Sequence, residues 1–456
     1  SLLVELDGAE AALDSFRQAV QLDNTYAEAW FMLGWCQEQA GYTEEAATSY
    51  RQSTAIDATN AEAWFRLGNL QKIAGDLDDA RTSYLQSLAL RPDHAETHNN
   101  LGTTLQAMGE FETAIQAYQN ATRCQYDFVE AHYNCGRAHE ACRRLQDAIV
   151  CYRAAIDIDP EYEDARHSLG SALTIAGQLD EASTVIRQVL GIPKDSSTLP
   201  DLPIVPAPED NFPESSEVTL ATSLAPKNFE NQRKALQSWQ QLGFRVVSIN
   251  SADEISLLKD EFPDVEFIVA HRNASESFGK PYIYFDDVLE YFQSTDSRIC
   301  GIINSDIHLR NEKLLPFIQS ETRDAFLFGC RTDVTSLSDP DGSVYRYGFD
   351  YFFMDRKYFG MYPRDRFCIG LPWWDYWAPL VPVIRKIPVK QLTTEVALHI
   401  EHPLNWNDDN YIEFAHIIGE RLGVSRPPQT VKRLGTYQNL AWIMIEQYAD
   451  KVAIAD

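Results

Sequence analysis

Several features that would tie a chain to a membrane or to nucleic acid are missing from this sequence. No apolar run reaches the roughly 18 residues that a membrane-spanning helix needs. Basic residues are few: 39 lysines and arginines stand against 67 aspartates and glutamates, which gives a formal net charge of -28. So acidic a surface repels phosphate backbones and anionic lipid. We therefore expect no nucleic-acid partner and no membrane span.

Paired cysteines are missing as well. The eight cysteines are scattered, without a CxxC pair and without a histidine and cysteine cluster at the spacing of a zinc site. Structural thiols in a reducing compartment are the simplest interpretation, so we expect a cytoplasmic protein. Apolar residues make up 45 % of the 456 residues, which indicates packed cores and more than one domain.

The first half of the chain repeats itself every 34 residues. The tetrapeptide AEAW occurs at Ala27 and Ala61, and AETH and VEAH follow at the same step. Three residue types recur with this period: Gly34, Gly68, Gly102, Gly136 and Gly170; Ala46, Ala80, Ala114, Ala148 and Ala182; Tyr50, Tyr84, Tyr118 and Tyr152. Such a period predicts a helix-turn-helix unit that stacks on copies of itself, with small residues where helices approach closely.

These motifs resemble those of the tetratricopeptide repeat family. The resemblance spans about residues 1–190, five repeats after a partial one, and we assign the repeat domain to residues 1–192. It implies an all-α superhelix whose first helices line a groove for a protein or peptide partner. In that groove Asn100 and Asn134 are candidates for holding a peptide backbone by bidentate hydrogen bonds. The lysine pattern of repeats that clamp a C-terminal carboxylate is absent.

A proline-rich segment, residues 193–216, predicts a semi-extended linker. Beyond it the residue pattern is no longer a helical repeat. Helical patterns there alternate with the strand-like runs VTLATSL, RVVSIN, VEFIVAH and RICGIINSDI. This alternation predicts βαβ units in a mainly parallel sheet. The predicted fold class is therefore an all-α superhelix followed by an α/β, Rossmann-like domain over residues 217–456 with a helical tail.

Ligands of parallel sheets bind beyond the carboxyl ends of the strands. On the predicted sheet that edge carries Ser223, Asn250, His271, Arg272 and the triplet Asn304-Ser305-Asp306. Asp286 and Asp287, on the helix before the triplet, are expected to be solvated.

The second half is similar to glycosyltransferases of the GT-A fold, especially the inverting type. The similarity covers about residues 217–405 as pattern and spacing: ATSLAPKNFENQRKALQSW, SINSADE and HRNASESFGK follow the first three strands, and an apolar strand ends in NSD. Two features depart from the family, because Asn304 replaces an acid and the usual glycine-rich turn after the second strand is missing. The similarity implies a UDP- or GDP-sugar bound by Ser223, Asn250, Asp253, Arg272, Lys280, Asn304 and Ser305.

The same similarity implies a metal ion. A Mn²⁺ or Mg²⁺ ion neutralises the departing diphosphate as a Lewis acid, and the last acid of the family's DxD motif holds it. Asp306 takes that position, and a late histidine, His402 or His399, would complete the metal sphere. The alternatives are a triplet that only ends a strand and a histidine that is structural.

The stretch GLPWWDYW gathers three tryptophans around Asp375. In the family an acid well beyond the DxD motif acts as the catalytic base, which assigns that role to Asp375. Tryptophan faces suit sugar rings, so Trp373 and Trp374 are expected in an acceptor cleft together with Asp350. The alternative is a buried aromatic core in which Asp375 caps a helix starting at Tyr376.

Three functions compete. The first is a metal-dependent glycosyltransferase whose repeats recruit the acceptor or a partner protein. The second is a non-catalytic interaction protein with a degenerate transferase domain, for which Asn304 is the best support. The third is a metal-dependent phosphohydrolase or nucleotidyltransferase that uses Asp306 and Asp375. A shared cleft for these two acids, with Lys280 or Arg272 nearby, would favour an enzyme.

Overall fold

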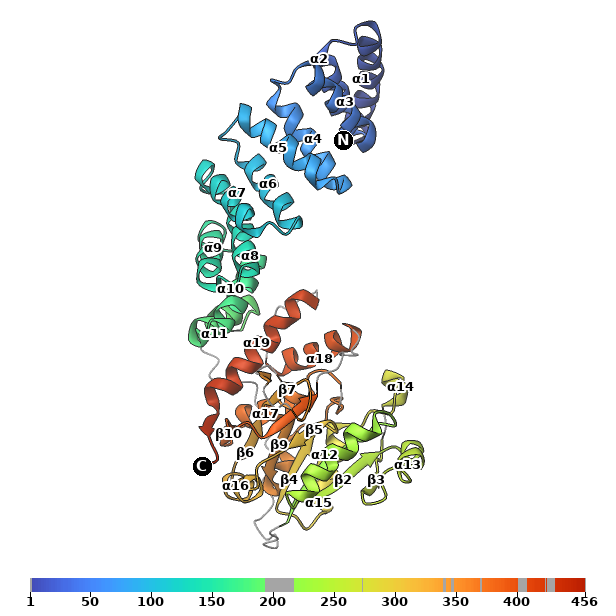
Figure 1. Ribbon diagram of the computed structural model, residues 1–456, viewed down its shortest axis with the longest axis vertical. Helices are drawn as coiled ribbons and strands as arrows, with labels where there is room; N and C mark the ends of the chain where they lie inside the picture. Colours follow the sequence, from blue (N-terminus) through green and yellow to red (C-terminus); the bar gives the residue numbers. More distant parts are fainter. Residues whose placement is uncertain are drawn as a thin grey trace. The chain divides into compact units, whose positions relative to one another are not determined.

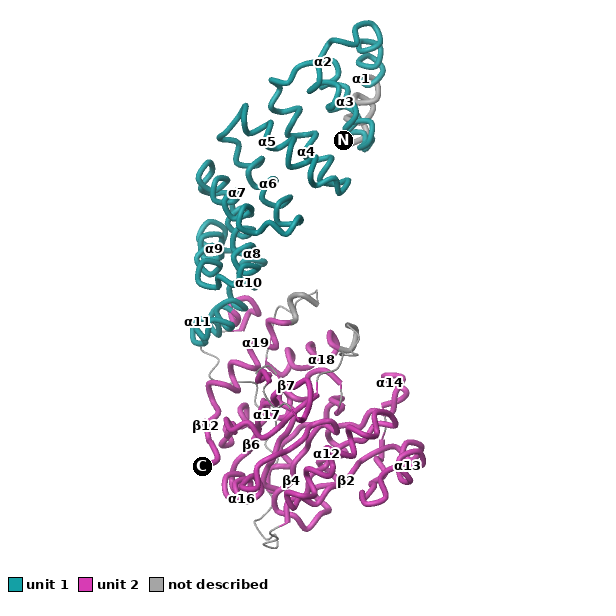
Figure 2. The backbone as a smooth tube through the Cα atoms, viewed as in Figure 1, with its two compact units in different colours: residues 1–185 teal, residues 186–456 magenta. Residues whose placement is uncertain are grey.

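The computed structural model describes residues 2–192, 217–272, 274–338, 342–345, 348–369, 371–400, 408–422, 424 and 431–455. The chain divides into two compact units, residues 1–185 and 186–456 (Figure 2). The predicted linker over residues 193–216 and His402 lie outside the described residues.

Antiparallel helix pairs build the N-terminal unit (Figure 1). The helices are α1 (Leu2–Leu22), α2 (Ala27–Gln39), α3 (Thr43–Ile56), α4 (Ala61–Ala74), α5 (Leu77–Leu90), α6 (Ala95–Ala107), α7 (Phe111–Cys124), α8 (Val129–Ala141), α9 (Leu145–Ile158), α10 (Glu163–Ile175) and α11 (Leu179–Val189). The even-numbered helices from α2 to α10 are the first helices of five repeats. The predicted helix-turn-helix repeat is therefore confirmed.

The repeating glycine and tyrosine meet where the two helices of a pair approach most closely. Tyr118 is fully buried, and a Cβ atom at Gly102 would lie 2.6 Å from its ring. A larger side chain at this position would displace the ring, because protein interiors have little free volume. The turn between the two helices of a repeat needs a residue with positive φ. Glycine supplies it in the first, second, third and fifth repeats, and Arg143 supplies it in the fourth, with φ of 59°.

The main sheet of the C-terminal unit has the strand order β12-β10-β6-β9-β4-β1-β2-β3. The strands are β1 (Val218–Thr222), β2 (Arg245–Asn250), β3 (Glu266–Val269), β4 (Ile299–Ile303), β6 (Phe326–Gly329), β9 (Tyr351–Asp355), β10 (Val389–Leu392) and β12 (Asp450–Val452). Strand β9 runs antiparallel to its neighbours β4 and β6, whereas the other pairs are parallel. The sheet is therefore mixed.

A second, smaller sheet has the order β5-β11-β7-β8 and is also mixed. Its strands are β5 (Ile307–Leu309), β7 (Arg331–Val334), β8 (Ser343–Tyr345) and β11 (Ala397–Ile400). The run RICGIINSDI, predicted as one strand, is divided between the two sheets. Strand β4 ends at Ile303 in the main sheet and β5 begins at Ile307 in the second, so Asn304-Ser305-Asp306 forms the turn between them.

Helices flank these sheets: α12 (Phe229–Gln241), α13 (Ala252–Leu258), α14 (Ser275–Phe278), α15 (Phe285–Ser294), α16 (Leu314–Glu321), η1 (Arg356–Met361), α17 (Trp374–Ile384), α18 (Asp408–Arg421) and α19 (Val431–Tyr448). Trp239 of α12 is fully buried and donates to the carbonyl of Ile307 at 2.8 Å, which anchors α12 to the start of β5. Lys280, predicted to bind the nucleotide sugar, lies in the exposed connection between α14 and α15. Across the described residues, no helix combines the length and apolarity that crossing a bilayer requires.

Candidate functional site

Polar side chains gather where the two sheets part. Because β9 runs against β4 and β6, its first residues lie at the edge where those strands end. The turn after β4, the start of β7, the start of β9, the middle of β11 and the first turn of α17 meet there. These elements supply what we call the carboxylate cluster: Asn304, Asp306, Arg331, Asp333, Asp350, Asp375 and His399.

Arg331 joins two acids of the cluster. Its Nη1 donates to Asp350 at 2.7 Å and its Nε to Asp333 at 2.8 Å. Burial raises the pKa of the Asp350 carboxyl, and the Arg331 charge opposes that shift. Asp350 was predicted to point into an acceptor cleft; instead it is 3 % exposed and also accepts a hydrogen bond from Asn304 Nδ2 at 3.0 Å. Arg331 and Asn304 thus hold this acid in place.

His399 connects Asp333 with Asp306. Its Nδ1 lies 2.8 Å from Asp333 Oδ1, and its Nε2 lies 3.6 Å from Asp306 Oδ2. When Nδ1 donates to the Asp333 carboxylate, the ring's lone pair is on Nε2, on the side of Asp306. Two oxygen or nitrogen atoms that bind one ion at about 2.1 Å and a right angle lie about 3 Å apart, so the observed 3.6 Å corresponds to a wider ligand angle. Asp306 and His399, one of the two predicted histidines, thus offer two neighbouring ligand atoms.

Asp375 lies in the first turn of α17 and is half-buried. Burial, and next the charge of Asp350, raise the pKa of Asp375 to about 7, against hydrogen bonds from backbone amides such as those of Phe349 and Tyr376. A carboxyl that titrates near neutral pH can accept and release protons in catalysis. Asp350 also feels the charge of Asp306, which makes Asp375 and Asp306 members of one electrostatic cluster.

Trp373 and Trp374 are each 3 % exposed. The indole of Trp373 donates to the carbonyl of Tyr411 at 3.1 Å, and its ring packs against those of Tyr376 and Tyr411. Protein covers both tryptophans, so the prediction that they stack on a sugar does not fit the structure. They form the aromatic core that was the alternative interpretation.

Asn250, predicted to bind the nucleotide, is fully buried. Its amide donates to the carbonyl of Leu224 at 2.8 Å and to Glu254 at 3.2 Å, and lies 3.4 Å from the Ser223 hydroxyl. Asn250, the last residue of β2, therefore ties the loop after β1 to α13. Asp253 is exposed on α13.

Arg272 binds α15 rather than the carboxylate cluster. Its Nε and Nη2 donate to Asp287 at 2.9 and 2.6 Å, and its guanidinium lies 4.7 Å from the centre of the Tyr284 ring. Asp287, expected to be solvated, is 4 % exposed because it pairs with this arginine. Burial also raises the pKa of Asp286 to about 6. The predicted donor residues therefore divide into separate polar groups.

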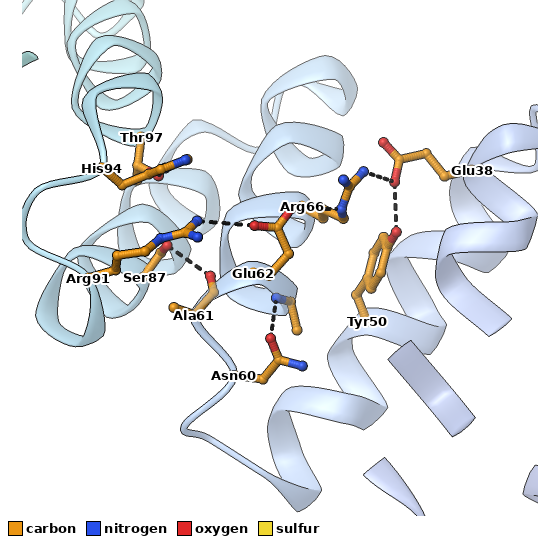
Figure 3. Close-up of polar contacts among 11 residues, drawn as sticks. Glu38, Tyr50, Asn60, Ala61, Glu62, Arg66, Ser87, Arg91, His94 and Thr97 are labelled. Carbon is orange, nitrogen blue, oxygen red and sulfur yellow. Dashed lines mark hydrogen bonds and ion pairs between the residues drawn. The ribbon is translucent and has the colours of Figure 1, made fainter. Parts of the chain in front are cut away.

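In the helical unit, polar contacts link the first helix of one repeat to the next. Arg66 pairs with Glu38 of the preceding repeat at 3.2 Å and with Glu62 at 3.0 Å, and Glu62 pairs with Arg91 (Figure 3). The two predicted groove residues join this pattern. Asn100 donates to Asn69 at 2.9 Å and Asn134 donates to Asn99 at 3.1 Å, so one amide hydrogen of each is already in use.

One cluster was missed by the search for zinc spacing along the sequence. Cys135, His139 and Cys151 offer ligand atoms that lie within 4.8 Å of one another across the α8–α9 pair. The spacing between the second and third residues belongs to a helix pair rather than to a zinc finger, which is why a comparison with zinc-site spacings does not find this group. Alignment of the five repeats would have shown the three exceptions.

Comparison with known proteins identifies the helical unit. Two tetratricopeptide repeat models match, one over residues 59–127 and the other over residues 1–61 and 99–163. Residues 1–190 form tetratricopeptide repeats. Both matches lie within the first 163 residues, and no curated protein matches the chain.

Several solved structures resemble parts of this chain. Two crystal structures of MamA are 23 % and 25 % identical, cover 34 % and 40 % of this chain and 90 % and 98 % of their own, and give TM-scores of 0.33 and 0.35. YrrB, described as a tetratricopeptide protein with an unusual peptide-binding site, is 18 % identical, covers 40 % of this chain and 94 % of its own, and gives a TM-score of 0.37.

Proposed function

We propose that the tetratricopeptide array binds an extended peptide or protein segment, and that the chain acts as a protein-interaction protein. One observation carries this proposal: a row of partly exposed polar side chains runs along the first helices α4, α6 and α8. This first-helix row consists of Arg66, Asn69, Lys72, Asn100, Thr103 and Asn134.

Contacts within the row support a role in recognition. Asn69 accepts from both Tyr84 and Asn100, and Lys72 reaches Thr103 at 3.4 Å, so the side chains are held before a partner arrives. A preordered surface loses less conformational entropy on binding. Amide groups that are ordered and partly exposed suit the N–H and C=O groups of an extended backbone.

A peptide-display selection on the full chain tests this proposal. We expect the substitution Asn100→Ala to lower the affinity for an enriched peptide by about tenfold. This is the effect of losing one hydrogen bond worth roughly 1.4 kcal/mol. Asn120→Ala on the second helix α7 is the matched control and should leave binding unchanged. Fluorescence anisotropy gives both affinities, and a loss caused by Asn120→Ala alone would refute the proposal.

The carboxylate cluster favours a second candidate function for the C-terminal unit, transfer of a sugar from a UDP- or GDP-sugar. Two predicted residues support it, since Asp306 and Asp375 belong to one cluster. Asp306 and His399 would hold a Mn²⁺ or Mg²⁺ ion, which supplies Lewis-acid neutralisation of the diphosphate when bound. Asp375, with a pKa of about 7, would accept the proton of the acceptor hydroxyl.

Other contacts limit this second candidate. Asn304 brings no charge and its amide is bound to Asp350, while Arg272 is held by Asp287 on α15. The interaction protein with a degenerate transferase domain is therefore the stronger proposal, and a phosphohydrolase would use the same two acids.

A thermal-shift panel of UDP- and GDP-sugars, with and without Mn²⁺, separates these functions. A transferase predicts a metal-dependent rise in melting temperature with one nucleotide sugar, lost in Asp306→Asn and kept in Asp260→Asn, an exposed control. Asp375→Asn should retain that binding and lose turnover. If no nucleotide sugar stabilises the wild-type chain with or without metal, the transferase function is refuted.

A further inference from the structure

The fourth tetratricopeptide repeat differs from the others at three positions inside its helix pair. Cys135 takes the place of Leu101 and Leu169 in the neighbouring repeats, and His139 takes the place of a leucine. At the position of Cys151 the other repeats carry small or apolar residues: Ser49, Ser83, Ala117 and Val185. In the first two repeats these inner positions form a Gln–Ser hydrogen bond, of 2.6 Å and 2.7 Å. The fourth repeat alone carries two thiols and an imidazole there.

The helix geometry brings the three side chains to one point. Cys135 and His139 are four residues apart on α8, and Asp147 and Cys151 are four residues apart on α9, so each pair shares a helix face. Because the two helices are antiparallel, Cys135 faces Cys151 and His139 faces Asp147. The ligand atoms of the two cysteines and the histidine lie within 4.8 Å of one another, and His139 Nδ1 lies 3.8 Å from Asp147 Oδ2.

His139 supplies an independent observation. The residue is 6 % exposed, and its Nδ1 has no hydrogen-bond partner among the described residues. A buried nitrogen without a partner costs free energy, and native structures rarely leave one in that state. The imidazole that carries this unsatisfied atom belongs to the same group of possible metal ligands as the two thiols.

We propose that Cys135, His139 and Cys151 bind a zinc ion, with Asp147 or water in the fourth position. Zinc prefers tetrahedral sets of thiolate and imidazole ligands, and with bonds of about 2.3 and 2.0 Å such ligand atoms lie roughly 3.5 to 4 Å apart. Binding releases one proton from each thiol to solvent, and the two thiolates balance the charge of the ion. The ion then joins α8 to α9 where the other repeats use apolar contacts or a Gln–Ser bond.

Cobalt and zinc titrations of the reduced, metal-free full chain test this site. We expect one equivalent of Co²⁺ to produce a thiolate-to-cobalt charge-transfer band and the visible absorption of a tetrahedral ion, both of which Zn²⁺ removes. Cys135→Leu and Cys151→Ala introduce residues that the neighbouring repeat already carries at these positions, so both variants should fold. Each should lower the zinc affinity by at least about 100-fold, since each removes a metal ligand.

Cys142→Ala is the matched control, because Cys142 follows α8 directly but lies outside the cluster. It should keep the cobalt spectrum and the zinc affinity. Zinc should also raise the melting temperature of the wild-type helical unit and leave that of Cys135→Leu unchanged. Failure of the reduced chain to take up one ion, or equal uptake by Cys135→Leu, would overturn the proposal. The proposal would also be overturned if Cys135 and Cys151 formed a disulfide in the purified chain and the chain took up no zinc after that disulfide was reduced.

Discussion

At the scale of single residues, Asp375 shows how burial changes the ionisation of a side chain. Burial and the nearby Asp350 raise its pKa from 3.8 to about 7, while backbone amides at the start of α17 act in the opposite direction. Between these two values the folded chain keeps a proton that the unfolded chain has released. The free energy of unfolding therefore falls as the pH rises through this range.

Asp375→Asn should remove this part of the pH dependence. One such carboxyl contributes at most about 1.4 kcal/mol per pH unit, and the partial exposure of Asp375 makes a smaller slope the expectation. Denaturant unfolding between about pH 5 and pH 8 should show the variant gaining stability relative to wild type as the pH rises. Asp260→Asn, on the exposed surface, should stay parallel to wild type. Parallel curves for Asp375→Asn would contradict the raised pKa.

The similarity to GT-A glycosyltransferases, carried by the apolar strand before Asn304 and the interval to Asp375, implied that Asp306 and Asp375 share a site. In the structure Asp350 lies within electrostatic reach of both acids, and the shared site stays a prediction. The pairing of Arg331 with Asp350 was not predictable, because it depends on β9 running against β4 and β6. Nothing in the local sequence of residues 347–359 shows that direction.

At the scale of helices and strands, the glycine and tyrosine of each repeat fix the distance between two helices. Gly102→Ala would place a Cβ atom 2.6 Å from the ring of Tyr118, which is fully buried and cannot move without repacking. Overpacking of this kind costs about 1 to 3 kcal/mol. We expect the helical unit to lose that much stability in denaturant unfolding followed by circular dichroism.

Gly435→Ala in α19 is the control, because it should raise the free energy of unfolding rather than lower it. Among the described residues, no heavy atom outside the adjacent part of α19 lies within 4 Å of a Cβ atom built there. The substitution should therefore stabilise α19 by about 0.5 to 1 kcal/mol through helix propensity. If Gly102→Ala were as harmless as Gly435→Ala, the close approach of α6 and α7 would be contradicted.

Elements differed in how well the sequence predicted them. The 34-residue period predicted the helix pairs, because its recurring small residues mark where two helices approach closely. The division between β4 and β5 was missed because isoleucines continue on both sides of the turn, at Ile302, Ile303 and Ile307. Hydrophobic residues are needed in either sheet, so their presence does not show where a chain passes from one to the other. Likewise, the tryptophan-rich stretch around Asp375 does not show whether Trp373 is buried in the core or exposed to a ligand.

At the scale of the whole molecule, two units of different architecture share one acidic chain. The N-terminal unit repeats a single helix pair and presents its first-helix row, while the C-terminal unit gathers acids where two mixed sheets part. Repeat arrays bind partners along extended surfaces, and the strongly negative charge disfavours nucleic acid as that partner. We therefore expect the partner to be a protein or peptide that binds along the first helices, and this is our central claim.

Hydrogen–deuterium exchange of the full chain, with and without a peptide enriched by display, tests this claim most directly. Exchange reports on the backbone of both units at once, so it locates the bound peptide without any substitution. We predict slower exchange in α4, α6 and α8, where the first-helix row lies, and little change in α5, α7 and α9. Protection confined to the second helices, or to residues 217–455, would contradict the account.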